Sequence, residues 1–196
     1  MGFLSQLKKD IQLTTGGIKS MVKPNKTQQL LLEELRNLVI GIMTDMSIWR
    51  DFDLSPLYQI ELGLLRKNAT QRHGVTRWQR GFSRDQLSLD NLEVIELHPE
   101  LLNEEWSAYA AFVLHHEFIH ALGYRDHNKR FRLIENSWPG VNAGNQGPEF
   151  TEYLRMRTAK WLWVCANCET KFPRKKPSNG RYRCRKCSTI LADVKL

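Results

Sequence analysis

Residues 1–164 contain no cysteine, and no stretch of the chain approaches the run of roughly 18 apolar residues that a transmembrane helix needs. A membrane-spanning protein is therefore not expected. The first nine residues lack a long apolar run followed by a small-residue cleavage site, which argues against secretion. We expect a cytoplasmic protein, nucleoid-associated if it comes from a prokaryote. Its cysteines, confined to residues 165–187, are then more typical of metal ligands than of disulfides.

Excess positive charge is missing from most of the chain. Residues 1–150 carry 17 Lys and Arg against 18 Asp and Glu, a net charge of −1, whereas residues 151–196 carry 12 against 3, a net charge of +9. Such asymmetry suggests an appended module that meets a polyanion. A chain of 196 residues is also long enough to bury about 70% of its unfolded surface in one sizeable core.

The pattern His-Glu-x-x-His occurs once, at residues 116–120. On a helix, His116 and His120 lie on one face about 5–6 Å apart, close enough for both imidazoles to bind one zinc ion at about 2.0–2.1 Å. Glu117 lies beside the first ligand, where it reaches a water molecule without binding the metal. Burying these three polar side chains unpaired would be costly, and a metal relieves that cost.

The surrounding residues predict a buried helix between Asn103 and Gly123. Asn103 is suited to cap its start, and Gly123 to end it in a left-handed conformation. His115 points about 100° away from His116, and we interpret it as a structural or surface histidine. Apolar residues on most sides of this helix are Trp106, Tyr109, Ala110, Phe112, Val113, Phe118, Ile119 and Leu122.

The remaining patterns predict a helix and three strands before this helix, and two helices after it. The fold class is therefore α+β. The first helix is expected over residues 27–49, the strands over 57–65, 74–81 and 92–97, and the later helices over 127–137 and 149–159, separated by a glycine-rich loop at 139–147.

A catalytic zinc usually has three protein ligands and one position open for water. Two candidates follow the motif: Asp126, ten residues after His116, and His127, eleven after it. The aspartate spacing resembles that of secreted metzincins, which also need export and a methionine-bearing turn beneath the metal. We favour His127, because Phe131 four residues later would pack into the core, and we interpret Asp126 as a helix cap. More remote candidates, expected at strand edges, are His73 and His98.

The C-terminal quarter contains two Cys-x-x-Cys pairs, Cys165/Cys168 and Cys184/Cys187, with 15 residues between them. Two such pairs close a tetrahedral structural zinc site. Basic residues between the pairs are interleaved with aromatic ones, which offers cations for phosphates and rings for stacking on bases. The residues expected to bind nucleic acid are Lys171, Arg174, Lys175, Lys176, Arg181 and Arg183.

With these motifs in place, the chain resembles the SprT-like (Spartan-type) zinc metalloprotease family over most of residues 27–194. The resemblance rests on the helix and three strands before the motif, on His116–Ala121, on His127–Phe131 and on Asn179–Cys187. It implies a minimal zincin-like metalloprotease domain with an open groove. The implied organisation is an N-terminal extension at 1–26, the zincin domain at 27–159 and a four-cysteine zinc ribbon at 160–196.

One segment departs from the family pattern. Many members place the third histidine in Gly-His-Gly-Pro-Glu-Phe, whereas Gly144–Phe150 has no histidine. Either His127 supplies the third ligand, which we favour, or the site lacks its third histidine and is inactive.

The resemblance implies a zinc-dependent endopeptidase that acts on DNA-bound or DNA-crosslinked proteins. A zinc ion held by His116, His120 and His127 would polarise the scissile carbonyl and lower the pKa of water, and Glu117 would take the water's proton. The implied partners are DNA, single-stranded or damaged, and protein substrates. One alternative is a transcription-associated, nucleic-acid-binding zinc-ribbon protein with a non-catalytic zincin scaffold, and another is a metallohydrolase of other substrates. Glu117 favours an enzyme, because a scaffold does not require it.

Overall fold

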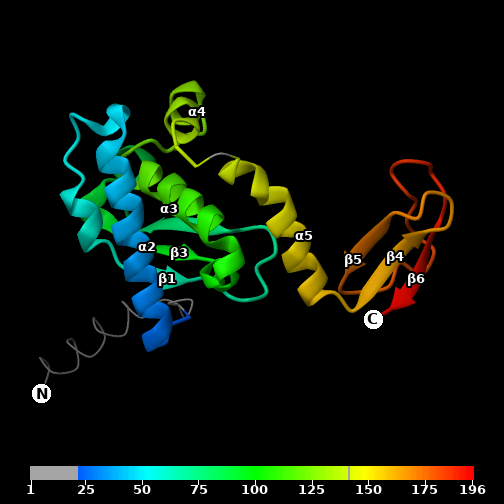
Figure 1. Cartoon of the computed structure of the whole chain (residues 1–196). Helices are drawn as coiled ribbons and strands as arrows, with labels where there is room; N and C mark the ends of the chain where they lie inside the picture. The colour runs from blue at the N-terminus through cyan, green and yellow to red at the C-terminus, as the bar shows by residue number, and fades with distance from the viewer. Residues whose placement is uncertain (1–21, 141) are drawn as a thin grey trace, which may run out of the picture.

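The computed structural model describes residues 22–140 and 142–196. The expected N-terminal extension, residues 1–26, therefore lies mostly outside the described residues. Figure 1 shows an α+β body from whose end helix α5 leads to a small separate sheet at the C-terminus. Within the described ranges, no helix is long and apolar enough to cross a membrane.

Helix α2, Lys26–Asp45, begins at a capping box. The Asn25 side chain accepts a hydrogen bond from the Gln28 backbone N–H, and the Gln28 side chain accepts one from that of Asn25. The helix ends four residues before the predicted Trp49, which instead lies in a 3-10 turn and is buried. The apolar residues that α2 buries are Leu32, Val39, Ile40 and Met43.

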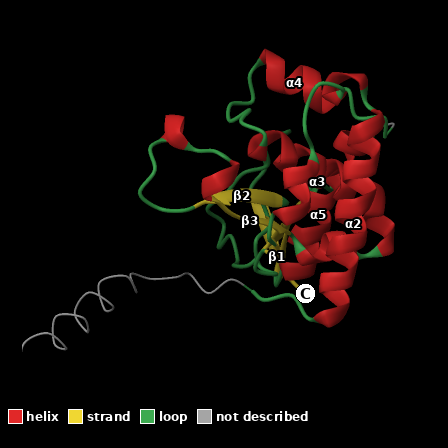
Figure 2. Ribbon diagram, turned by 90° about the vertical axis from the view of Figure 1, so that its left-hand side faces the viewer, coloured by secondary structure: helices red, strands yellow, loops and turns green. Residues whose placement is uncertain are grey.

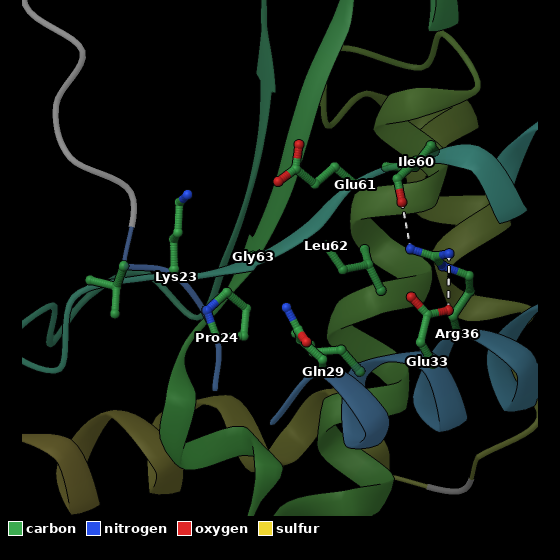
Figure 3. Close-up of a pocket in the computed structure, with 11 residues that line it drawn as sticks. Lys23, Pro24, Gln29, Glu33, Arg36, Ile60, Glu61, Leu62 and Gly63 are labelled. Atoms are coloured by element: carbon green, nitrogen blue, oxygen red, sulfur yellow. Dashed lines mark hydrogen bonds and ion pairs between the residues drawn. The ribbon is translucent and has the colours of Figure 1, made fainter. Parts of the chain in front are cut away.

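Arg36 is also buried on α2, and its guanidinium ties the helix to the chain that enters the first strand. It donates to the backbone carbonyls of Tyr58, at 2.7 Å, and Ile60, and it forms an ion pair with Glu33 at 3.1 Å. Arg36 lines a cavity between α2, residues 22–24 and that strand, as Figure 3 shows. The cavity has a volume of about 640 Å³. The buried charge of Arg36 is thus compensated locally, as a buried cation must be.

A mixed three-stranded sheet contains β1, Leu62–Leu64, β2, Gly74–Trp78, and β3, Leu92–Leu97. The strand order is β1-β3-β2, with β3 parallel to β1 and antiparallel to β2. The prediction for β3 is confirmed, but that for 57–65 is wrong over its first half. There, Ser55–Gln59 forms a 3-10 turn with proline in its first turn, where the fixed φ of proline suits a helical start.

Helix α3, Ser107–Ala121, carries the motif and packs against α2 and the sheet. Figure 2 shows α2 and α3 together on one side of the strands. The predicted cap of this helix by Asn103 is wrong: a 3-10 turn, Glu104–Trp106, intervenes, and the Asn103 amide donates to Glu100 instead. Gly123 follows the helix with φ of +96°, the left-handed conformation that the sequence predicted.

Two further helices follow the motif helix: α4, Lys129–Asn136, and α5, Gly147–Thr158. Asn128 caps α4, with its side chain accepting from the Phe131 N–H at 3.1 Å, so the prediction that Asp126 is the cap is wrong. His127 precedes α4 rather than lying in its first turn. Between the two helices, Ala143–Gln146 forms a 3-10 turn in the predicted loop.

The C-terminal sheet contains β4, Trp161–Cys165, β5, Lys171–Arg174, and β6, Leu191–Lys195. All pairs are antiparallel, in the order β5-β4-β6. Its core is small: buried Leu191 packs with the cysteines and the partly buried Trp163 and Phe172. So small an apolar core requires additional stabilisation, and a structural metal is a common source of it.

Candidate metal centres

The three predicted histidines converge on one point. Nε2 of His127 lies 3.1 Å from Nε2 of His120 and 3.2 Å from Nε2 of His116. Nitrogens held at about 2.0–2.1 Å around a tetrahedral zinc ion lie about 3.3 Å apart, so the spacing matches a shared ion closely. The four-residue spacing on α3 and the chain reversal at Gly123 together produce this arrangement.

Hydrogen bonds on the far side of two rings fix their orientation. Nδ1 of His116 donates to Oε1 of Glu135 at 2.6 Å, and Nδ1 of His120 donates to the carbonyl of Tyr124 at 2.8 Å. Each Nδ1 therefore carries the proton and leaves a lone pair on Nε2. The lone pairs of His116 and His120 both face His127, an arrangement that suits a zinc ion shared by the three rings.

Glu135 on α4 is buried and also accepts a hydrogen bond from Arg132 at 2.6 Å. Burial alone would raise its pKa, but the hydrogen bonds from His116 and Arg132 outweigh burial and lower the pKa to about 2. Glu135 is thus a carboxylate at neutral pH and stabilises the orientation of His116. Burial, followed by the nearby His116, lowers the pKa of His120 to about 4, so that His120 is neutral, as a metal ligand must be.

Glu117 lies next to this cluster, and its side chain is only 5% exposed. Burial is the main cause that raises the pKa of its carboxyl group, and the hydrogen bond from Thr76 opposes the rise. Oγ1 of Thr76, on β2, donates to Oε2 of Glu117 at 2.7 Å. The second oxygen, Oε1, accepts no hydrogen bond from the described residues and is available for a proton-transfer role.

Gly74 permits the close approach of β2 to the motif helix. A Cβ at this position would lie 2.7 Å from Oε1 of Glu117 and 2.9 Å from Cγ1 of Val113. Contacts under 3.0 Å force a shift of either the strand or the carboxylate. No motif or spacing in the sequence singles out this glycine.

We expect Gly74→Ala to lower the free energy of unfolding by about 1–3 kcal/mol, the usual cost of overpacking a close contact. Gly41→Ala is the matched control, because no atom lies within 4 Å of its added methyl group and alanine favours a helix interior. That variant should be more stable by about 0.5–1 kcal/mol. Chemical denaturation measures both, and equal effects of the two substitutions would contradict the close approach at Gly74.

A cavity of about 400 Å³ opens onto Glu117 and the three histidines. Its remaining lining comes from β2, from the loop between β2 and β3, and from Arg125. The Arg125 guanidinium donates to the carbonyls of Arg84 and Leu87 and holds this loop at the cavity. The Asp126 carboxylate forms an ion pair with Arg84 in this loop. His127, and not Asp126, lies in the cluster with the other two histidines.

The four cysteines form a second cluster. Sγ of Cys165 lies 3.3 Å from Sγ of Cys187, and Sγ of Cys168 lies 3.5 Å from that of Cys184. These separations exceed the disulfide bond length of about 2.05 Å, and all four sulfurs lie within 4.8 Å of one another. The set is compatible with one tetrahedral zinc ion, which thiolates bind at about 2.3 Å.

Each pair of cysteines is followed by a threonine that the sequence reasoning overlooked. The hydroxyl of Thr170 lies 3.2 Å from Sγ of Cys168, and that of Thr189 lies 3.5 Å from Sγ of Cys187. The side chain and then the backbone N–H of Thr189 lower the pKa of the Cys187 thiol to about 5, which favours the thiolate that binds metal. The repeated spacing Cys-x-x-Cys-x-Thr was the signal available in the sequence.

Three of the six predicted nucleic-acid-binding residues line one cleft, and three lie outside its lining. Lys171, Arg174 and Lys175 line a cleft between α5 and the C-terminal sheet, whereas Lys176, Arg181 and Arg183 are exposed outside its lining. Arg174 is partly buried, 4.9 Å above the ring of Trp163, which stacks on Tyr182 at 4.5 Å.

Of the remaining histidines, His98 and His115 are buried in the core, and His73 is half-buried. His115 is fully buried and stacks on Trp138 at 4.7 Å, so of the two interpretations the structural one is confirmed. His98 is also fully buried, before the turn that follows β3. His73 precedes β2 and contacts the Tyr109 hydroxyl at 2.7 Å and the Thr151 hydroxyl at 3.0 Å, joining α3 to α5.

The half-buried His73 predicts acid sensitivity. Burial, followed by the nearby His98, lowers its pKa from 6.5 to about 4. The unfolded chain therefore binds a proton at His73 before the folded chain does, so its stabilising effect is complete above pH 6.5 and is lost as the pH falls toward 4. In His73→Gln, the free energy of unfolding should fall less steeply with acidification over this window, by up to about 1.4 kcal/mol per pH unit. Urea titrations at several pH values measure the free energy of unfolding of both proteins. If it depended on pH equally in His73→Gln and the wild type, the lowered pKa of His73 would be contradicted.

Comparisons of the chain with protein-family models, with curated proteins and with solved structures found no match.

Proposed function

We propose that the protein is a zinc-dependent endopeptidase of the SprT-like type, with a minimal zincin-like domain at residues 27–159 and a zinc ribbon at 160–196. The observation that carries the proposal is a buried carboxylate, Glu117, beside three histidines whose Nε2 atoms converge in one open cavity. A structural role would explain the histidines as well, but it would not require a carboxylate with a free oxygen at their side.

The three histidines and Glu117 would have different roles in the reaction. His116, His120 and His127 would hold the catalytic zinc, which supplies Lewis-acid activation of a carbonyl and of water. Glu117 accepts the proton of the attacking water and returns it to the leaving amine. Its raised pKa suits both steps, because a base with a pKa nearer neutrality also donates more readily.

Strand β2 supports a polypeptide rather than a small molecule as the substrate. β2 lies at one edge of its sheet, and its residues Gly74, Val75, Thr76 and Trp78 line the cavity. An edge strand offers unpaired backbone groups to which an extended peptide can add as a further strand. A substrate bound in this way would pass over Glu117 and the histidines with little selection of side chains.

The cations and aromatic rings of the ribbon support an association with DNA. We accordingly place the protein in the cytoplasm, and at the nucleoid if it comes from a prokaryote. The exposed cations of the ribbon offer contacts to phosphates, and the exposed Tyr182, stacked on Trp163, offers a ring on which a base stacks. The proposed substrates are consequently DNA-bound or DNA-crosslinked proteins. The alternative, a transcription-associated zinc-ribbon protein with a non-catalytic scaffold, predicts the same binding without cleavage.

The test is degradation of a protein crosslinked to single-stranded DNA by the full-length, zinc-loaded protein, with and without a chelator. We expect metal-dependent cleavage that is faster on the crosslinked protein than on the same protein free of DNA. Binding without cleavage, with zinc fully loaded, would favour the scaffold alternative.

A further inference from the structure

Arg125 joins two connecting segments at the histidine cavity. One is the loop between β2 and β3, residues 79–91, and the other is the connection between α3 and α4, which carries His127. The Arg125 guanidinium donates to the backbone carbonyls of Arg84 and Leu87, and both of these residues line the cavity. The Arg125 side chain therefore fixes the main chain of the loop at the point where the loop forms a wall of the cavity.

The loop depends on polar contacts, because little of it is buried. Residues 79–86 are all exposed, Leu89 is half-buried, and Asn91 at the end of the loop is buried. Hydrogen bonds within the loop, such as that from the Gln86 N–H to the Ser83 carbonyl at 3.0 Å, maintain its turns but do not fix its place in the domain. A segment with few buried apolar contacts opens at a low cost in free energy, so an anchor at its centre has a large effect on its position.

The connection between α3 and α4 supplies both this anchor and the third histidine. Arg125 lies two residues before His127, and Asp126 between them forms an ion pair with the side chain of Arg84. Residues 124–128 belong to no helix or strand, so repeating backbone hydrogen bonds do not fix them. When His127 and the two histidines of α3 share a zinc ion, this connection is tied to α3. The position of the Arg125 backbone then depends on the metal.

We propose that Arg125 is a positioning residue that couples the histidine metal site to the wall of the substrate cavity. Zinc bound by His127 fixes Arg125, and Arg125 fixes the loop at residues 84–87. The inference deepens the proposed function and rests on its histidine metal site. Coupling between two sites is reciprocal, so the anchored loop also raises the affinity of the histidines for zinc. The wall of the cavity is complete only when the metal is bound.

Amide hydrogen exchange of the full-length protein, followed by NMR, measures the effect of zinc on the loop. The observed groups are the backbone N–H groups of Gln86 and Asn91, which donate to the carbonyls of Ser83 and Ser88 at 3.0 and 3.3 Å. We expect a weak chelator to remove zinc from the histidine site, to leave it at the cysteine site, and to speed this exchange about ten-fold. In Arg125→Gln, exchange should be fast with and without zinc, because two hydrogen bonds from a charged group are lost.

Zinc affinity, measured by competition with a chelator, provides the reciprocal test. Arg125→Gln should weaken zinc binding at the histidine site about ten-fold, the same factor by which zinc slows the exchange of the loop. Arg125→Lys keeps the charge and one donor group, so it should retain part of the coupling.

Two variants serve as matched controls. Arg130→Gln removes the same charge beside the same connection, but the Arg130 guanidinium lies over the ring of Tyr124, at 5.1 Å, and bonds to its hydroxyl. Arg84→Gln removes an exposed ion pair but retains the backbone carbonyl to which Arg125 donates. Neither variant should change the zinc affinity or the exchange of the loop by more than about two-fold.

Loop exchange that does not respond to zinc in the wild type would overturn the coupling. Equal losses of zinc affinity in Arg125→Gln and Arg130→Gln would also overturn it, because they would indicate general electrostatics. Cleavage of an unfolded protein is measured in parallel at saturating zinc, where Arg125→Gln should raise KM more than it lowers kcat, since Glu117 and the histidines are unchanged. Coupling without cleavage refutes the peptidase and leaves the role of Arg125, cleavage without coupling refutes that role alone, and absence of zinc at the histidines refutes both.

Discussion

Glu117→Gln should abolish proteolysis while leaving the metal centres and the fold intact. Glutamine has nearly the same shape as glutamate and replaces no metal ligand, so it can keep the hydrogen bond from Thr76. It cannot accept the proton of the attacking water, and loss of a general base typically costs about 10²–10⁴-fold in rate. The measurement is the rate of cleavage of the DNA-crosslinked protein, with zinc content and oligonucleotide binding determined on the same sample.

Glu104→Gln is the matched control, because it neutralises an exposed carboxyl group in the turn that precedes the same helix. That variant should cleave at the wild-type rate. Equal cleavage by Glu117→Gln and the wild type would show that Glu117 is not the base. Loss of zinc in Glu117→Gln would show instead that the carboxylate maintains the metal centre.

His127→Ala should remove the zinc of the histidine site, and Asp126→Ala should leave it bound. His127 supplies one of three converging nitrogens, and loss of a direct ligand should exceed the 10–100-fold loss of affinity that is typical of removing an outer-sphere partner. The Asp126 carboxylate is paired with Arg84, and an exposed ion pair of this kind contributes little to stability.

Zinc content after dialysis against a weak chelator measures both variants. We expect the cysteine site to retain its ion in both variants, so that it serves as an internal reference. Retention of the second zinc in His127→Ala, with its loss in Asp126→Ala, would establish the aspartate as the ligand.

Features encoded in short motifs and in runs of neighbouring residues were predictable from the sequence. The spacing of His116 and His120 determines their common face on a helix, and the two Cys-x-x-Cys pairs determine the ribbon cluster. β3 has its predicted bounds because its run of apolar residues fits a buried strand.

Features that depend on packing between distant segments were not predictable. Thr76 is 41 residues from Glu117, and Glu135 is 19 residues from His116, so no spacing rule connects them. Asn103 has the residue type of a helix cap, but a 3-10 turn separates it from α3. The sequence likewise does not show which cations of residues 160–196 line the cleft beside α5 and which lie outside it, because this depends on the position of each residue in the fold.

Anomalous scattering at the zinc absorption edge, from crystals of the full-length protein, tests the central claim most directly. The account predicts two peaks per chain: one equidistant from the Nε2 atoms of His116, His120 and His127, and one within the four cysteine sulfurs. A single peak at the cysteines, from protein purified and crystallised with zinc present, would contradict a catalytic metal centre at the histidines.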